Sequence, residues 1–206
     1  MASIAASRQS QVSGEPAWEI ARLFPNQGHW SVEEYFALPG NRLVEFSHGS
    51  VEVLSAPTEL HQIIVASLYE AIANFVRPRD LGKVLFAPLR IRLDASKIRE
   101  PDIAFMLKSN AGRRTNEFWE GADWVIEVVS NDDRRRDLEI KRFEYARAGI
   151  PEYWIVDPMN SQVIVLSLQE DRYIEIGVFH AGERAGSSVV KGFVLDVGQM
   201  FAAARE

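Results

Sequence analysis

DWVIEVVS, at residues 123–130, is the stretch that decides the fold of this chain. Its run from Val125 to Val129 reads as one strand buried on both faces, and Glu127 lies at the centre of that run. A carboxylate alone in an apolar layer is destabilising or takes up a proton, unless a cation or several hydrogen-bond donors meet it. The sequence therefore predicts a partner for Glu127, which neighbouring segments have to supply.

The segments around this stretch alternate between strand and helix patterns. A continuous apolar stripe at the helical period predicts a sheet-covering helix within residues 58–80. A second helix is bracketed by Asp132 and Asp133 as caps and by Gly149 and Pro151 as stop signals. Further strand-like runs are residues 83–93, 101–107 and 152–157. Strand, helix and strand in that order predict a parallel crossover.

Both ends of the chain carry antiparallel patterns. Near the N-terminus, Ser31 and Glu34 form a capping box that begins a short helix, and a hairpin turns near residues 48–49. Residues 162–201 alternate in the antiparallel manner, while residues 1–16 are small and polar and predict a disordered leader. The expected fold is α/β (α+β), a mixed sheet flanked by helices with hairpin additions at both ends, in one domain over residues 17–206.

Composition narrows the function classes. The chain has 206 residues, 47% of them hydrophobic, and no cysteine, which excludes disulfides, thiolate metal sites and cysteine nucleophiles. No apolar run is long enough to span a membrane, and the first residues lack the apolar core of a signal peptide. These features predict a soluble, cytoplasmic protein without a membrane partner.

The net charge of the chain opposes binding of nucleic acid, whereas its local charge distribution favours it. The net charge of −6 would repel a polyanion if it were spread evenly. A basic stretch nevertheless follows the central strand, from Arg134 to Arg147. Its alternative interpretation is a solvated helix face.

Two carboxylates are expected to converge in the sheet. Asp102 begins the strand-like run 101–107, which is a plausible neighbour of the strand that carries Glu127. Two carboxylates side by side repel, and a hard divalent cation such as magnesium or manganese holds both of them ionised. Alternatively, Asp102 only caps a turn after Pro101, and Glu127 pairs with a buried arginine such as Arg90 or Arg92.

Lys141 is expected to face the same place from the following helix. Its neighbours Leu138 and Tyr145 belong to the inward stripe of that helix. A lysine there can hold a phosphate or an attacking water and stabilise developing negative charge, and Asp137 at i−4 can orient it. The alternative is that Lys141 extends past Tyr145 to solvent.

Taken together, four motifs resemble a known family. EPDIAF, ADWVIEVVS, the spacing from Asp137 to Lys141, and YARAGIPEYWIVDP resemble the Uma-type restriction endonucleases, a bacterial branch of the PD-(D/E)xK nuclease superfamily. The resemblance extends from about Trp30 to Phe201. It implies a restriction-endonuclease-like core with Asp102 and Glu127 as Mg²⁺ or Mn²⁺ ligands and Lys141 as the catalytic lysine.

The sequence also departs from the superfamily pattern. The usual lysine follows the glutamate by two residues, where this chain has Val129, so Lys141 must substitute from the helix as it does in the Uma-type pattern. His48 stands where the family usually has an acidic residue. Glu45 and His61 match positions that the family fills with the same residue types, as accessory ligands or positioning groups; otherwise Glu45 is an exposed charge and His61 a cap or core group.

The sequence predicts a metal-dependent endonuclease that hydrolyses phosphodiester bonds in nucleic acid, with DNA as the expected substrate. A homodimer is compatible with this function, because cutting both strands of a duplex commonly uses two sites. The alternative is a non-catalytic relative that keeps the fold and binds DNA or a protein partner, which the net acidity favours. A third reading is hydrolysis of another phosphate ester at the same site.

Overall fold

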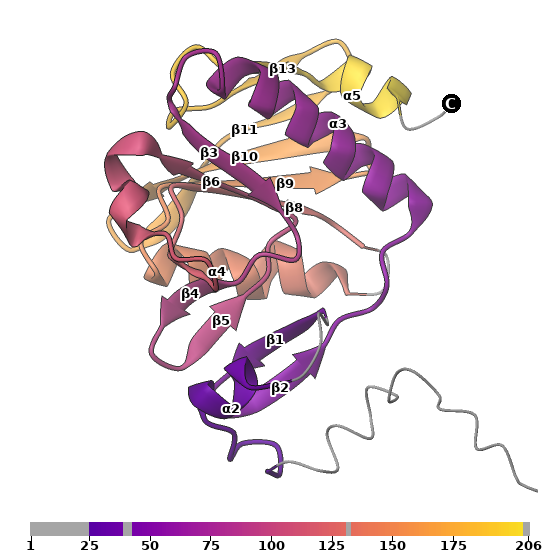
Figure 1. Ribbon diagram of the computed structural model, residues 1–206. Helices are drawn as coiled ribbons and strands as arrows, with labels where there is room; N and C mark the ends of the chain where they lie inside the picture. The colour runs from indigo at the N-terminus through magenta and orange to yellow at the C-terminus, as the bar shows by residue number, and fades with distance from the viewer. Residues whose placement is uncertain (1–24, 39–42, 131–132, 204–206) are drawn as a thin grey trace, which may run out of the picture.

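A six-stranded mixed sheet forms the centre of the molecule in the computed structural model (Figure 1), which describes residues 25–38, 43–130 and 133–203. The expected leader lies outside these residues. β8 and β9 pair in parallel and the other neighbours are antiparallel, which confirms the predicted crossover. In sheet order the strands are β11 (Arg172–His180), β10 (Gln162–Gln169), β9 (Glu152–Asp157), β8 (Trp124–Val128), β6 (Ile103–Leu107) and β3 (Gly82–Phe86).

Helices cover both faces of this sheet. α3 (Glu59–Val76) lies along one face and α4 (Lys141–Arg147) along the other, above and below the strands in Figure 1. Strand alternation divides β8 between them, because Ile126 and its i±2 neighbours pack toward α3 while Val125 packs with Tyr145 of α4. Glu127 shares the parity of Val125, so its side chain belongs to the α4 face.

A five-stranded sheet stands beside the first. Its strands, in order, are β2 (Ser50–Val53), β1 (Val44–Ser47), β5 (Lys97–Arg99), β4 (Ile91–Asp94) and β7 (Trp119–Glu120). The short helix α2 (Val32–Phe36) packs against it through Tyr35, whose hydroxyl donates to the Val44 carbonyl at 2.7 Å. The predicted capping box of α2 and the hairpin between β1 and β2 are confirmed.

The run from 83 to 93 corrects a sequence prediction. The sequence predicts one strand there, but the run forms β3 and β4, which belong to different sheets. Pro88 lies between them, and a proline has no N–H to donate to a strand partner and has a fixed φ. The chain therefore leaves the large sheet at Pro88 and enters the small one.

The second predicted helix begins irregularly. Arg136–Ile140, labelled η2, is a π-helical turn that continues directly into α4, and the Lys141 N–H donates to the Arg136 carbonyl. Asp133 caps the start by accepting from the Arg136 N–H at 3.2 Å, whereas the other expected cap, Asp132, lies outside the described residues. The expected stop holds, since Gly149 has φ +73° directly after the helix.

The C-terminal elements close the α3 side of the large sheet. β12 (Arg184–Gly186), β13 (Val194–Asp196) and α5 (Val197–Ala203) lie beside α3 (Figure 1). Phe193 contacts the rings of Trp124 and Trp154, and so joins this segment to the centre of the sheet. A 3₁₀ turn, η1 (Lys108–Arg113), follows β6. The fold class predicted from the sequence, a mixed sheet flanked by helices, is confirmed.

Candidate active site

A cavity of about 820 Å³ opens where β6 and β8 meet the start of α3 and the turn η2. It is also bordered by the segment after β2 and by residues 87–88 and 158–159. Five residues singled out in the sequence line it: His61, Asp102, Glu127, Asp137 and Lys141. The elements α3, β8, η2 and α4, together with the residue directly before β6, thus bring the predicted residues to one place.

Asp102 and Glu127 are neighbours across two antiparallel strands. The register pairs Ile103 with Ile126, which puts the adjoining residues Asp102 and Glu127 opposite each other. Oδ2 of Asp102 accepts from the Val128 N–H at 2.8 Å, so the carboxylate is bound across the sheet rather than in a local turn. Its Oδ1 has no hydrogen-bond partner among the described residues and remains free for a ligand.

Two side chains of the protein itself bind the carboxylate of Glu127. Its side chain lies 2.9 Å from Lys141 Nζ through Oε2, and the Tyr145 hydroxyl donates to Oε1 at 2.6 Å. Glu127 is 2% exposed, and this burial raises its pKa to about 8, although the positive charge of Lys141 acts in the opposite direction. The alternative arginine partners are excluded, since Arg90 pairs with Glu100 and Arg92 with Glu120.

Lys141 connects two carboxylates. Nζ lies 2.9 Å from Glu127 and 3.0 Å from Asp137, and the residue is 6% exposed, so it does not extend to solvent. Burial by itself would lower the pKa of Lys141, but the charges of Glu127 and Asp137 outweigh it and raise the pKa. An ammonium has three donors, and these two carboxylates use two of them. The third can reach a water or a phosphoryl oxygen in the cavity.

His61 faces Asp102 from the first turn of α3. Thr58 caps this helix by accepting from the His61 N–H at 3.3 Å, and the ring Nε2 lies 3.1 Å from Asp102 Oδ2. Burial would lower the pKa of His61, but its hydrogen bond with Asp102 and the charge of that carboxylate raise it. His61 therefore contributes positive charge beside Asp102 over a wider pH range than a free histidine does.

Glu45 lies behind the cavity wall in β1. Its carboxylate accepts from Arg99 Nη1 at 2.7 Å, from the Glu100 N–H at 2.9 Å and from Arg136 Nη2. Burial raises its pKa, but Lys141, Arg99 and Arg136 outweigh burial and lower the pKa to about 2. The alternative of an exposed charge is wrong, since Glu45 is fully buried.

Several polar residues of the site were not singled out from the sequence. Arg136 lines the cavity, and Arg99 donates to Glu144 at 2.8 and 3.0 Å. Glu100 also lines the cavity with Oε2 unpaired, and burial, reinforced by Glu45 and opposed by Arg90, raises its pKa to about 7. In the sequence, Arg136 belonged to the basic stretch and Glu100 to the EPDIAF motif, but neither was assigned to the site. Contacts between distant segments leave no periodic pattern that would reveal them.

The donor chemistry of the cavity fits a divalent metal, although no complete ligand set is present. Within residues 25–38, 43–130 and 133–203, no group of three or more His, Asp or Glu side chains is arranged to hold a metal ion. Magnesium needs fewer protein ligands, because it usually keeps several waters and binds through one or two carboxylates plus substrate phosphate. Asp102, with its free Oδ1, and Glu127 are the residues that would hold it.

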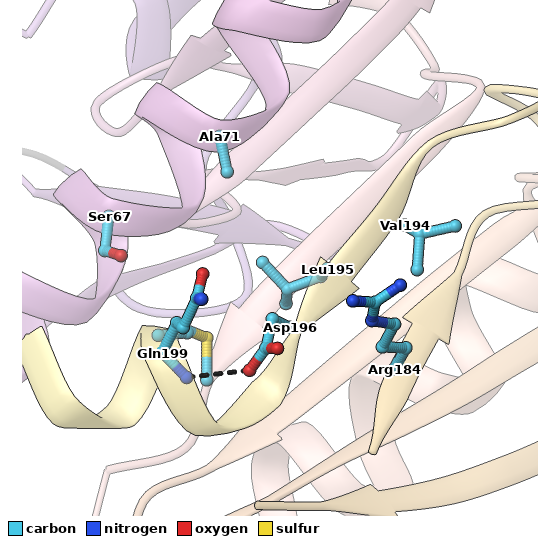
Figure 2. Close-up of a pocket in the computed structure, with 8 residues that line it drawn as sticks. Ser67, Ala71, Arg184, Val194, Leu195, Asp196 and Gln199 are labelled. Carbon is cyan, nitrogen blue, oxygen red and sulfur yellow. Dashed lines mark hydrogen bonds between the residues drawn. The ribbon is translucent and has the colours of Figure 1, made fainter. Parts of the chain in front are cut away.

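A second cavity, of about 330 Å³, lies between α3 and the C-terminal elements. Figure 2 shows Ser67 and Ala71 of α3 on one side and Arg184 and Gln199 on the other, with the Gln199 N–H donating to Asp196 at 2.9 Å. None of the residues predicted for the site lines it. The chemistry expected from the sequence therefore concentrates in the first cavity.

Comparisons with known proteins identify the family of this chain and a structure that resembles it. The chain resembles a solved structure described as "a putative nuclease belonging to DUF820 from Anabaena variabilis ATCC 29413", with a TM-score of 0.71 and 20% identity over 84% of this chain and 98% of that one. No curated protein matches the chain, and no described helix is long and apolar enough to cross a membrane. The Uma2 family, described as "Putative restriction endonuclease", matches residues 32–198. This chain shares the fold of the Anabaena structure, and it belongs to the Uma2 family.

Proposed function

We propose that this protein is a metal-dependent endonuclease that hydrolyses phosphodiester bonds in nucleic acid, with DNA as the preferred substrate class. The observation that supports this most is the convergence of Asp102, Glu127 and Lys141 in one cavity, with the two carboxylates on adjacent strands. Membership of a nuclease family adds to it. A scaffold has no need of such a set, because replacing buried ion pairs with apolar residues is often neutral or stabilising.

The charge of the cavity explains why a cation would be required. Among the described residues, five carboxyl groups and three basic side chains line it, so the lining offers no excess of positive charge to the phosphates of a substrate. A bound divalent cation would supply positive charge and lower the pKa of water, which generates the nucleophile near neutral pH. The five carboxylates belong to Glu100, Asp102, Glu127, Asp133 and Asp137.

Each residue of the protein at this site would have its own role in the reaction. Asp102 and Glu127 hold the cation, and the Tyr145 hydroxyl fixes the orientation of the Glu127 carboxylate. Lys141 presents its third N–H to the attacking water or to a phosphoryl oxygen and offsets the negative charge that develops there. Asp137, 3.0 Å from Nζ, keeps the Lys141 side chain in place.

The test compares cleavage by the wild type with that by two isosteric variants, Asp102→Asn and Glu127→Gln. Substrates are supercoiled plasmid, single-stranded circular DNA and RNA, each with Mg²⁺, Mn²⁺ or EDTA. We expect cleavage only with metal, and a loss of roughly a hundredfold or more in either variant, because each removes a charged ligand. Circular dichroism would check that both variants remain folded.

A matched control is Glu152→Gln. Glu152 is buried in the neighbouring strand β9, where it accepts from the Ser188 and Val189 N–H groups outside the cavity. This variant should keep its cleavage rate per folded molecule. Full cleavage by both carboxylate variants would overturn the proposal, and nucleic-acid binding without any cleavage by the wild type would favour the non-catalytic alternative.

A further inference from the structure

Arg136 is a basic residue of the cavity lining that has unused hydrogen-bond donors. Of the three basic residues in the lining, Lys141 binds two carboxylates and His61 faces Asp102. The guanidinium of Arg136 has five N–H donors, and within the part of the chain that the structure describes only Nη2 is engaged, by Glu45 and Glu52. Arg136 Nε is buried without a partner, and Nη1 has none among the described residues.

Binding the two carboxylates of Glu45 and Glu52 does not by itself explain why an arginine is present at position 136. Arg99 already donates to both of them through Nη1, to Glu45 at 2.7 Å and to Glu52 at 2.7 Å. A buried N–H without an acceptor is destabilising, so nearly all such groups in folded proteins are paired. Nε is closed off by the surrounding residues, so Nη1, which is not buried, is the donor available to a ligand in the cavity.

The π-helical turn η2 places this side chain beside the catalytic candidates. In a regular α-helix, Arg136 and Lys141 would point about 140° apart, because each residue advances the helix by about 100°. Here the Lys141 N–H bonds to the Arg136 carbonyl five residues earlier, and the wider turn brings both side chains to the cavity. Turns of this kind are often found at functional sites.

We propose that Arg136 binds a phosphate of the substrate backbone in this cavity through the guanidinium donors that Glu45 and Glu52 leave free. Guanidinium is well suited to phosphate, because it is always charged and presents several donors in one plane. The inference rests on the proposed function, since it takes the substrate to be a nucleic acid. It assigns Arg136 to substrate binding, whereas Asp102, Glu127 and Lys141 act at the bond that is cut.

The test measures binding of fluorescent 24-nucleotide oligonucleotides, single- and double-stranded, with phosphorothioate linkages that resist cleavage. Anisotropy titrations over a series of salt concentrations compare the wild type with Arg136→Gln, Arg136→Lys and Arg135→Gln in the presence of Mg²⁺. The last variant is the matched control, because Arg135 is the adjacent arginine and is exposed in a pair with Glu139. Urea denaturation of each protein reports stability separately.

We expect Arg136→Gln to raise Kd about tenfold and to reduce the slope of log Kd against log salt by about 0.9 for duplex, the value for one lost phosphate contact. Arg136→Lys should restore the slope, because the charge returns, but only part of the affinity. Arg135→Gln should match the wild type. If Arg136→Gln is too unstable to assay, the double variant with Glu52→Gln removes a facing carboxylate and permits the same comparison.

A structural role for Arg136 predicts a different result, namely lower stability with unchanged Kd and unchanged salt slope. That result, with normal binding by the wild type, would overturn this inference and leave the proposed function standing. If the wild type bound no oligonucleotide in any condition, the proposed function would fail, and the inference with it.

Discussion

Glu127 is a carboxylate whose partners were predictable in kind from the sequence. Its position in an apolar strand predicted that a cation or several donors must meet it, and the structure supplies both in Lys141 and Tyr145. The inward direction of Lys141 followed from helical periodicity, because Leu138 and Tyr145 mark the same stripe. The hydrogen bond from the Tyr145 hydroxyl could not be predicted, since a tyrosine in an apolar stripe looks like an ordinary core residue.

Glu45 gives a residue-scale prediction for pH. Its folded-state pKa of about 2 lies below the ordinary value of 4.5, so the ionised carboxylate stabilises the fold above about pH 4.5, and this stability is lost as the pH falls toward 2. The difference corresponds to roughly 3 kcal/mol at neutral pH. Urea denaturation of Glu45→Gln should show a deficit of this order at pH 7 that shrinks between pH 5 and 2.

The control for this measurement is Glu117→Gln, which alters an exposed carboxylate. Its free energy of unfolding should follow the wild type at every pH. If the loss of unfolding free energy in Glu45→Gln stayed constant from pH 7 to pH 2, the contribution of Glu45 to stability would not depend on its ionised form.

At the scale of elements, the segment η2–α4 joins the two sheets. Its outward residues face solvent, as Phe143 does, while Glu144 reaches the small sheet through Arg99 and Lys97. The helix itself was predictable from its stop signals. Its π-helical start was not, because sequence patterns assume 3.6 residues per turn. At that spacing Arg136 belongs to the basic stretch and does not share a face with Lys141.

Two carboxylates of the η2–α4 segment are predicted to contribute differently to the stability of the fold. Glu144→Ala leaves the buried Arg99 guanidinium with fewer partners and should lower the free energy of unfolding by about 3 kcal/mol. Glu139→Ala breaks an exposed pair with Arg135 and should change stability little. Guanidinium denaturation of both variants measures the difference. Equal losses would contradict the assignment of Glu144 as the buried connection between α4 and β5.

At the scale of the whole molecule, the cavity lies where separate parts of the fold meet. The large sheet contributes Asp102 and Glu127, the small sheet contributes Glu45 behind the wall, and two helical segments contribute His61 and Lys141. A ligand held between the two central strands would bind only the folded chain. Its binding free energy would therefore add to the stability of the whole fold.

Metal addition provides the whole-molecule prediction. At a free Mg²⁺ or Mn²⁺ concentration of a hundred times Kd, the wild type should gain about 2.7 kcal/mol of stability, and its Tm should rise by several degrees. EDTA should reverse the rise. Differential scanning calorimetry of the double variant Asp102→Asn with Glu127→Gln is the comparison, and an equal rise in that variant would show that the metal binds elsewhere.

The sequence by itself determined the fold class, the parallel crossover from β8 to β9, and the faces on which Asp102, Glu127 and Lys141 lie. Those features depend on periods of two and 3.6 residues, which are local properties of the chain. Only the tertiary structure decided that residues 83–93 divide between two sheets and that Arg136 enters the cavity. It also decided that Glu45 is buried among arginines. These depend on contacts between segments far apart in the chain, which no local period records, because burial and ion pairing are fixed only when the layers pack together.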